Sequence, residues 1–407
     1  MKNFLTVLLI SLSAFYCRAQ DNNLLTIGKV DSLYSAVLQE QRSIWIYLPS
    51  SFDSASDARY PVIYLLDGNA YFHSTAGLVK QMSSFGNTSC PESIIVAIPN
   101  TNRQRDLKPY DPAEGEPASS GIEKFTNFIE SELIPYVDSK YATLPYRTLI
   151  GHSTGGSFVV STLTNHPELF TNYLAIDPGL KSHENRFYHQ SVELLQNGSY
   201  KDKLLYMAVA NTMPASMDTL TALQDTTWVT STIRSTLTFA KALDQMVSNQ
   251  LTYQWKFYSN ENHISVPTVS TYEGLKYFFS WHVLDLDKIL RTTPEITGEA
   301  LFSKVIGHYQ NVSEKLKYEV LPSQEQVNDL GYFFLQKEDL QGAILFFALN
   351  VKNFPNSSNV HDSIGDYYLS EGSTDKAAES YGKAIEIDGN PLSKEKLEQL
   401  NSQKKTN

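Results

Sequence analysis

The stretch of sequence that decides the fold is Gly151-His152-Ser153-Thr154-Gly155-Gly156, which contains the pattern Gly-x-Ser-x-Gly. A short strand-like run, residues 148–150, precedes it, and residues 157–163 after it have the composition of a helix. A strand, this pattern and then a helix are typical of a nucleophile elbow, a sharp turn that exposes a serine side chain. We therefore predict that Ser153 is the nucleophile of a serine hydrolase. The alternative is a structural glycine-rich turn.

The regions around this turn predict the rest of the sheet. Short apolar runs alternate with amphipathic helical stretches, and the runs are residues 44–48, 62–66, 94–98, 149–150, 173–176, 204–209 and 253–258. Buried strands joined by helices are typical of a parallel sheet covered on both faces. The predicted fold class is α/β, an α/β-hydrolase fold with a mostly parallel central sheet. One of its helices is expected at residues 123–134 and is expected to end at Pro135.

A serine hydroxyl needs a base within hydrogen-bonding reach. In α/β-hydrolases the nucleophile is followed along the chain by the acid and then by the histidine, beyond the last strand. Of the nine histidines, His263 follows the last predicted strand, residues 253–258, and is the expected base. His152, inside the elbow, is expected to pack and to form hydrogen bonds rather than to act as a second base.

The acid that would orient the histidine is less sharply defined. Asp218 is the first choice, because it is the nearest carboxylate after the strand at residues 204–209, where this fold commonly places the acid. Asp177, at the end of the preceding strand, is the alternative. Asp225 and Glu261 are further candidates, and a Ser-His pair oriented by a backbone carbonyl also remains open.

Acyl transfer needs hydrogen-bond donors for the oxyanion that develops in the transition state. The fold is expected to supply backbone N–H groups from Thr154, directly after the nucleophile, and from Gly68 or Asn69, after the strand at residues 62–66. Asp67-Gly68 also fits a plain turn. Because no cluster of cysteines and histidines has metal-ligand spacing, we expect no metal, and we expect no cofactor.

Five stretches, in order along the chain, carry a more specific signal: Tyr64-Leu65-Leu66-Asp67-Gly68, Asn100-Thr101-Asn102-Arg103-Gln104-Arg105-Asp106, Glu132-Leu133-Ile134-Pro135-Tyr136, Ile150-Gly151-His152-Ser153-Thr154-Gly155-Gly156 and Asn260-Glu261-Asn262-His263. Together they resemble the esterase family of α/β-hydrolases (esterase D and enterochelin-esterase-like). This family includes siderophore esterases, S-formylglutathione hydrolase, feruloyl esterases and mycolyltransferases. The resemblance covers residues 31–281.

The resemblance implies that Ser153 is the nucleophile, that His263 is the base, and that the Asp67-Gly68 loop is part of the oxyanion site. It also implies residues that line or brace the mouth of the site, with a structural ion pair as the alternative: Arg103, Arg105 and Asp106.

The sequence departs from the family pattern in three places. Thr154 stands where a larger apolar residue is usual. Residues 177–180 replace a serine-rich stretch that is followed by tryptophans, so an aromatic wall of the acyl pocket is missing. Residues 211–213 lack the glutamates often found after this strand, which leaves the acid open.

Composition and charge limit the partners of this chain. It has 407 residues, a net charge of -11 and a pI of about 5.3. An acidic chain without basic runs argues against nucleic acid as a partner. Lys2, the apolar residues 4–16 and Cys17-Arg18-Ala19 form a predicted signal peptide, residues 1–19. We expect an exported chain, periplasmic or secreted, with no membrane span after cleavage; a retained N-terminal anchor is the alternative.

The C-terminal part predicts a second, all-α unit. Gly331, Ala343, Phe347, Phe354 and Asn356 recur 34 residues later as Gly365, Ala377, Tyr381, Asp388 and Asn390. This period is typical of tetratricopeptide helix pairs. The expected domains are a hydrolase domain at residues 20–284, a helical linker at 285–321 and tetratricopeptide-like repeats at 322–400. The repeats are expected to dock a protein partner or to brace the hydrolase.

These observations favour an exported serine esterase that acts on a small-molecule ester through an acyl-enzyme intermediate. Acyl transfer to another hydroxyl would use the same residues and is the neighbouring alternative. A different alternative is an inactive hydrolase fold that binds a partner through its repeats. The sequence does not identify the ester; siderophore, feruloyl and acetyl esters all remain open.

Overall fold

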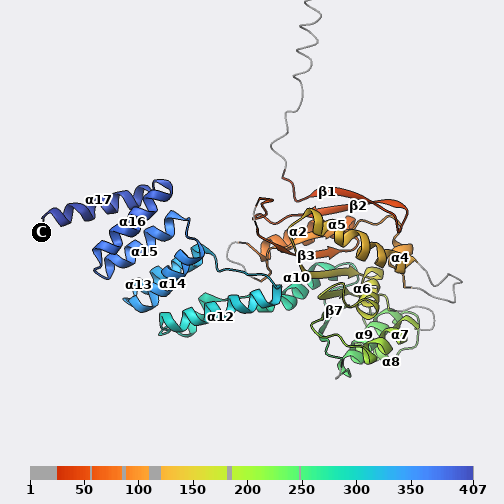
Figure 1. Ribbon diagram of the computed structural model, residues 1–407. Coiled ribbons are helices and arrows are strands. Elements are labelled where there is room, and N and C mark those ends of the chain that lie inside the picture. The colour runs from red at the N-terminus through yellow and green to blue at the C-terminus, as the bar shows by residue number, and fades with distance from the viewer. Residues whose placement is uncertain are drawn as a thin grey trace, which may run out of the picture.

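The computed structural model describes residues 25–55, 57–84, 89–109, 121–180, 186–246 and 249–406. The expected signal peptide, residues 1–19, lies outside this described part. Within it, a sheet with helices on both faces is followed by a separate group of helices (Figure 1). This arrangement confirms the predicted fold class, an α/β fold with a mostly parallel sheet and a helical C-terminal region.

The described sheet has eight strands, in the order β1-β2-β4-β3-β5-β6-β7-β8. Their bounds are β1 (Lys29–Ser35), β2 (Glu40–Tyr47), β3 (Tyr60–Leu65), β4 (Ile94–Ala97), β5 (Thr143–His152), β6 (Asn172–Ile176), β7 (Leu204–Ala210) and β8 (Thr252–Tyr258). β2 pairs antiparallel with β1 and β4, and all other neighbours are parallel. β1 was not predicted, because as an edge strand it keeps several residues exposed and lacks a continuous apolar run.

Helices cover the sheet on both faces. They are α2 (Gly68–Met82), α3 (Arg103–Leu107), α4 (Gly121–Phe128), η2 (Ile129–Leu133), α5 (Ile134–Lys140), α6 (Thr154–Asn165), α7 (Arg186–Asn197), α8 (Thr219–Gln224), α9 (Ser231–Asp244), α10 (Val266–Phe278) and η4 (Ser280–His282). Phe125, Phe158 and Phe239 lie in the core on one face. Phe72 and Phe278 lie in the core on the other. Because the neighbouring strands from β4 to β8 are all parallel, their carboxyl ends lie at the same edge of the sheet, where ligands bind in such sheets.

The helix predicted to end at Pro135 continues through it. α4 passes into the π-helical turn η2, which passes into α5, and Pro135 lies in the first turn of α5. A proline is tolerated there because its missing N–H has no required acceptor. The π-helical turn also presents Glu132, which accepts hydrogen bonds from the backbone N–H groups of Ala36 (2.9 Å) and Val37 (3.1 Å) and so ties this helix to the β1–β2 connection.

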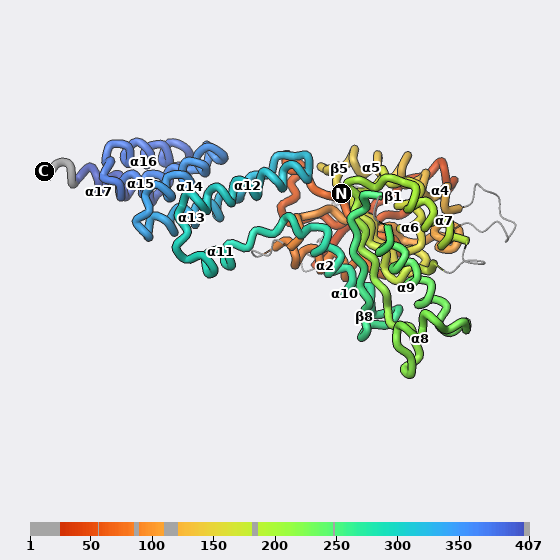
Figure 2. The backbone as a smooth tube through the Cα atoms, turned by 90° about the horizontal axis from the view of Figure 1, so that it is seen from below, coloured from red at the N-terminus to blue at the C-terminus, as the bar shows by residue number. Residues whose placement is uncertain are grey.

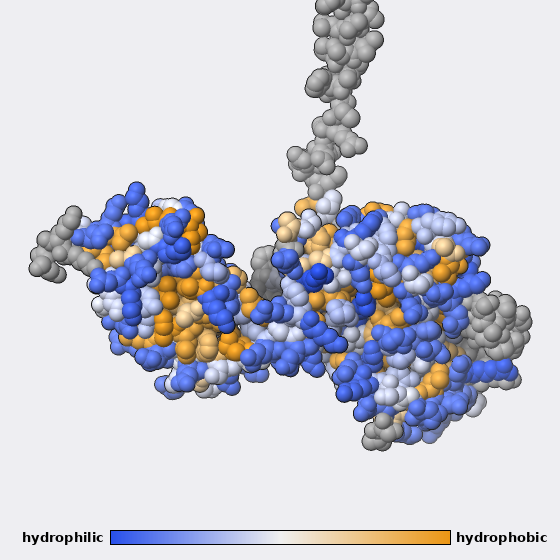
Figure 3. Space-filling view, in the orientation of Figure 1, coloured by the Kyte–Doolittle hydropathy of each residue, from blue (hydrophilic) through white to orange (hydrophobic). Residues whose placement is uncertain are grey.

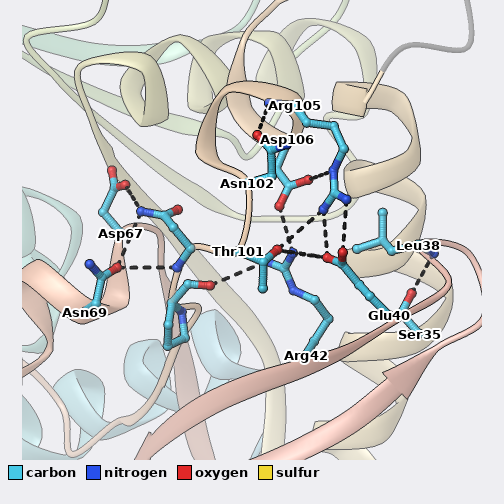
Figure 4. A network of polar contacts seen from close by, with 12 residues as sticks. Ser35, Leu38, Glu40, Arg42, Asp67, Asn69, Thr101, Asn102, Arg105 and Asp106 are labelled. Carbon is cyan, nitrogen blue, oxygen red and sulfur yellow. Dashed lines mark hydrogen bonds and ion pairs between the residues drawn. The ribbon is translucent and has the colours of Figure 1, made fainter.

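A buried ion cluster joins β2 to α3 (Figure 4). The guanidinium of Arg42 is 1% exposed, lies 5.2 Å from the ring centre of Phe125, and donates to Asp106 and Glu40 at 2.8 Å each. Arg105 completes the cluster with ion pairs to Glu40 (2.7 Å) and Asp106 (2.6 Å). Arg105 and Asp106 therefore fit the alternative of a structural ion pair, rather than a place at the mouth of the site.

The remaining helices extend away from the sheet domain (Figure 2). They are α11 (Leu286–Thr292), α12 (Gly298–Leu316), α13 (Gln324–Gln336), α14 (Leu340–Asn353), α15 (Ser358–Ser370), α16 (Thr374–Asp388) and α17 (Pro391–Thr406). α12 joins the two parts: Val312 and Leu316 pack into a core of the sheet domain, whereas Leu301 and Val305 pack against α13 and α14. Figure 3 shows apolar surface on the visible face of the C-terminal helices. None of the helices in the described ranges is both long and apolar enough to cross a membrane.

The helix pairs α13/α14 and α15/α16 repeat one contact. Gly331 faces the ring of Phe347, and 34 residues later Gly365 faces the ring of Tyr381. The two pairs are also joined directly, because the hydroxyls of Tyr332 and Tyr381 both donate to the carboxylate of Asp366, at 2.8 Å each. The period read from the sequence therefore corresponds to repeated packing.

Candidate active site

Ser153 occupies the turn between β5 and α6. Its φ and ψ angles are 58° and -119°, a combination that costs energy for any residue with a side chain and that is found where surrounding structure imposes it. The turn is tight enough that a Cβ atom on Gly151 would lie 2.3 Å from the carbonyl oxygen of Gly155. The N–H of Ser153 donates to Ile176 O (2.9 Å), which ties the turn to the neighbouring strand β6. This is the strand–turn–helix geometry that the sequence predicts.

His263 and Asp177 form a close pair beside this turn. His263 lies between β8 and α10 with its side chain 34% exposed, and its Nδ1 atom is 2.6 Å from Asp177 Oδ2. Asp177 follows β6 and is completely buried, and its other carboxylate oxygen accepts a hydrogen bond from the N–H of Ala210 (3.0 Å). A carboxylate at Nδ1 holds the imidazole in the tautomer that leaves Nε2 free to accept a proton.

The ranking of Asp218 as the first-choice acid is corrected by this geometry. Asp218 is exposed and caps α8, with its carboxylate accepting from the N–H of Thr221 (2.7 Å). Asp177 is at the site because β5 and β6 are parallel neighbours in register, with His152 opposite Ile176. The residues that directly follow these two paired positions, Ser153 and Asp177, therefore lie side by side. The carboxylate of the other candidate, Asp225, accepts hydrogen bonds from the hydroxyls of Thr227 and Thr230, at 2.5 Å each.

The loop that carries His263 is fixed by backbone contacts. Asn211, directly after β7, donates its N–H to Glu261 O (2.7 Å) and its side-chain amide to Ser259 O (2.9 Å). The side chain of Asn262 accepts from the N–H of Ile264 (2.9 Å). Glu261 thus contributes its carbonyl to this loop, and Asn211 holds the loop where a glutamate was expected from the family pattern.

The serine, the histidine and the aspartate share one pocket of about 330 Å³, within the range of ligand sites. Its lining residues are Ser153, Asp177, Gly179, Thr212, Val229, Thr232 and His263. No group of three or more His, Cys, Asp and Glu side chains within the described ranges is arranged to hold a metal ion. The groups brought together at this pocket are a hydroxyl, an imidazole and a carboxylate.

The candidate oxyanion donors are reduced from three to two. The N–H of Gly68 donates to Ile98 O (3.0 Å) and is therefore already paired. The prediction of Gly68 as an oxyanion donor is corrected accordingly. Thr154 and Asn69 lie in the first turns of α6 and α2. N–H groups in the first turn of a helix have no acceptor within that helix. These two amides remain the candidates.

An ion pair links the loop before α2 to the elbow. Asp67 is buried with a φ of 53°, and Arg103 binds its carboxylate through Nε (2.6 Å) and Nη2 (3.0 Å). The same Nη2 atom donates to His152 O (3.1 Å). Asn100 also donates to Asp67 (2.7 Å), next to the ion cluster drawn in Figure 4. Arg103 therefore braces the site, as the resemblance implied, by holding one candidate oxyanion loop against the turn of Ser153.

We expect Arg103→Met to lower the free energy of unfolding by about 2 kcal/mol, because it leaves the buried carboxylate of Asp67 without its cation. The loss is smaller than for a fully buried ion pair, because Arg103 itself is partly exposed. Chemical denaturation measures this loss. Asp67→Asn combined with Arg103→Met should recover part of the stability, because the uncompensated charge is then absent. Equal stability of the single and double variants would contradict a role for charge pairing at Asp67.

The imidazole ring of His152 packs against that of His263. The hydroxyl of Tyr71 lies 2.9 Å from Nδ1 of His152, and the His152 and His263 rings have their centres 4.4 Å apart. Burial, and secondly the neighbouring His263, lowers the pKa of His152 to about 4, so the ring is neutral near pH 7. His152 is thus a packing and hydrogen-bonding residue in this geometry. Tyr71 was missed in the sequence analysis, since no local pattern links α2 to the elbow.

The lowered pKa of His152 makes stability depend on pH. An unfolded histidine has a pKa near 6.5, so between that value and about 4 the unfolded chain binds the proton that the folded chain excludes. We therefore expect this residue to cost about 2 kcal/mol of unfolding free energy between pH 7 and pH 5. Denaturation of the wild type and His152→Gln at both pH values tests this. The variant should lose less stability than the wild type on acidification, and equal losses would contradict the assignment.

Comparisons with known proteins agree with this fold. Residues 35–233 match the family described as "Putative esterase". Ferri-bacillibactin esterase BesA of Bacillus subtilis is 30% identical over an alignment of 177 residues, and the match covers 39% of this chain and 61% of that relative. The chain therefore spans about three fifths of the length of this curated relative. An IroE-like serine hydrolase from Shewanella oneidensis is 28% identical with a TM-score of 0.63, covering 79% of this chain and 98% of its own.

A further match extends beyond the sheet domain into the C-terminal helices. An uncharacterised protein from Capnocytophaga ochracea has a TM-score of 0.67 at 17% identity, and the match covers 92% of this chain and 99% of that one. At this identity the likeness concerns the fold. The fold is that of an α/β-hydrolase, and Ser153 lies in the turn between its strand β5 and its helix α6. The comparisons support the class of esterase or hydrolase for this chain, with siderophore esterases among its relatives.

Proposed function

We propose that this chain hydrolyses carboxylic esters through an acyl-enzyme intermediate. Ser153 Oγ attacks the ester carbonyl carbon while Nε2 of His263 takes its proton, and the buried Asp177 carboxylate stabilises the resulting imidazolium. The N–H groups of Thr154 and Asn69 stabilise the oxyanion of the tetrahedral intermediate. His263 then gives its proton to the leaving alkoxide, which departs as the alcohol. Water attacks the acyl enzyme with His263 as base, releasing the acid and restoring Ser153.

The observation that carries this proposal is the 2.6 Å contact between His263 Nδ1 and Asp177 Oδ2 in the pocket that Ser153 also lines. A serine turn alone is a weak signal, but a histidine whose Nδ1 is held by a buried carboxylate is prepared to act as a base at Nε2.

The proposed function is tested by covalent labelling. A fluorophosphonate probe reacts with an activated serine and should modify the protein in equimolar amount, and peptide mass spectrometry should locate the label on Ser153. The same preparation should hydrolyse p-nitrophenyl acetate and butyrate. Denatured protein is the control for chemical labelling of unactivated hydroxyls. Absence of both labelling and turnover would overturn the proposal.

For the natural substrate we propose an ester of the siderophore class. The support is the relative named ferri-bacillibactin esterase, which is 30% identical over 177 residues. Turnover of a ferric tricatecholate trilactone should exceed that of a feruloyl ester of equal concentration, measured by chromatography of the released acids. The reverse order would redirect the substrate assignment to feruloyl esters.

We also propose that the protein is exported after cleavage at residue 19, and that residues 20–284, 285–321 and 322–400 form the hydrolase domain, a helical linker and tetratricopeptide-like repeats that contact a protein partner. The repeated helix-pair packing supports the repeats. N-terminal sequencing of the protein recovered from its source should begin at Gln20. A retained residue 1 would contradict cleavage.

A further inference from the structure

Large apolar side chains are exposed beside the pocket that holds Ser153. Trp228 is 81% exposed, Val229 45% and Ile264 78%. Val229 and His263 both line the pocket, Trp228 precedes the first of them, and Ile264 follows the second. We call Trp228, Val229 and Ile264 the apolar rim. Single exposed apolar residues are ordinary on protein surfaces, but several next to one pocket indicate a binding surface.

The backbone that presents Trp228 is rigidly held even though its side chain is in solvent. Trp228 O accepts hydrogen bonds from the N–H (3.2 Å) and the hydroxyl (2.6 Å) of Ser231. Asp225 accepts from the hydroxyls of Thr227 and Thr230, at 2.5 Å each. Arg234 crosses beneath this turn and donates to Thr230 Oγ1 (2.6 Å) and Thr227 O (3.2 Å). A rigid turn that holds an exposed tryptophan loses little entropy when a ligand packs on it.

The polar contacts within this turn also explain why its apolar side chains face outward. The hydroxyl of Thr230 donates to Asp225 and accepts from Arg234 on the inner side, and Thr230 is completely buried. Trp228 lies between α8 and α9 and is 81% exposed, outside those polar contacts. Figure 2 shows α8 standing out from the rest of the sheet domain. The ring is therefore available to whatever lies over the pocket.

We propose that the apolar rim binds an aromatic group of the ester, so that the enzyme selects esters with an aromatic acyl or alcohol part over small aliphatic esters. This inference rests on the proposed function and names the substrate class of the same site. A pocket of about 330 Å³ holds the reacting ester group and leaves a bulky substituent outside, over Val229 and toward Trp228. A tryptophan face offers a flat apolar surface that favours aromatic partners.

A lipid surface is the competing occupant of an apolar rim. The net charge of -11 opposes approach to an anionic bilayer. The three rim residues lie on two separate loops around a pocket rather than along one helix, unlike the amphipathic helices that lie on membranes. An aromatic substituent of a bound ester matches the location of the rim beside the pocket better.

The test compares ethyl acetate with two aromatic esters that each differ from it in one half: ethyl 3-phenylpropionate in the acyl half and 2-phenylethyl acetate in the alcohol half. In the wild type, kcat/KM for at least one aromatic ester should exceed that for ethyl acetate by about tenfold. Trp228→Ala should reduce that value by about fivefold to tenfold, mainly through KM, and leave ethyl acetate unchanged within about twofold. Trp228→Phe should retain most of the preference. Leu392, an exposed apolar residue on α17, supplies the matched control: Leu392→Ala should leave kcat/KM unchanged for all three esters.

The outcomes separate this inference from the proposed function. Hydrolysis of all three esters without an aromatic preference, or an equal loss for all three in Trp228→Ala, overturns the apolar rim and leaves the esterase proposal standing. Absence of hydrolysis together with absence of labelling at Ser153 overturns the proposed function instead. Ligand-observed NMR with Ser153→Ala and ethyl 3-phenylpropionate reports binding without turnover, and the signal should weaken when Trp228→Ala is added. Sedimentation with neutral or anionic phospholipid vesicles that depends on Trp228 would assign the rim to a membrane and overturn the inference.

Discussion

Ser153→Ala is expected to lower kcat for p-nitrophenyl acetate by about 10⁴- to 10⁶-fold, the range seen when the nucleophile of a catalytic triad is removed. The loss is this large because the hydroxyl forms the covalent bond on which both half-reactions depend. The folded structure should be retained, since alanine keeps the apolar Cβ and the N–H of Ser153 still pairs with Ile176 O (2.9 Å). Removing the hydroxyl also leaves the elbow, at φ 58°, in place for the remaining site.

Stopped-flow and steady-state spectrophotometry measure this change, and circular dichroism confirms that the variant is folded. Ser161→Ala, on the same helix α6 and half-buried, is the matched control and should keep full activity. The fluorophosphonate label should disappear in Ser153→Ala and persist in Ser161→Ala. Turnover by Ser153→Ala within tenfold of the wild type would contradict the nucleophile assignment.

Asp177→Asn is expected to lower kcat by about 10³- to 10⁴-fold with little change in KM. The amide has nearly the same shape as the carboxylate, but it can donate a hydrogen bond to His263 Nδ1 and so favours the tautomer in which Nε2 carries the proton. Such an imidazole cannot accept the proton of Ser153. The imidazolium that forms during attack also loses its negative partner, which lies 2.6 Å away in the structure.

Asp218→Asn supplies the comparison, because Asp218 was the first choice from the sequence. It caps α8 at the protein surface and faces Thr221 rather than His263, so its substitution should leave kcat within about twofold. The pH dependence of kcat/KM separates a tautomer effect from unfolding, since Asp177→Asn should alter the profile as well as the maximum rate. Loss of activity in Asp218→Asn alone would show that the pair seen between Asp177 and His263 is not the functional one.

The sheet domain was predictable from the sequence because its signals are local. Apolar runs marked seven of the eight described strands, since buried parallel strands are nearly continuous in hydrophobic residues. β1 escaped this criterion, because an edge strand exposes part of its length. The continuation of α4 into α5 through Pro135 also escaped, because a π-helical turn depends on how the chain is accommodated rather than on residue type.

The sequence by itself determined two candidate residues, Ser153 in its Gly-x-Ser-x-Gly turn and His263 shortly after the last strand. Both could be found because the residues that mark them are their neighbours along the chain. Only the tertiary structure decided their partners. The register of β5 against β6 places Asp177 beside the serine and leaves Asp218 on the surface, and pairing with Ile98 O occupies the N–H of Gly68. Sequence distance carries no information on such contacts, because parallel strands bring together residues that long helical connections separate along the chain.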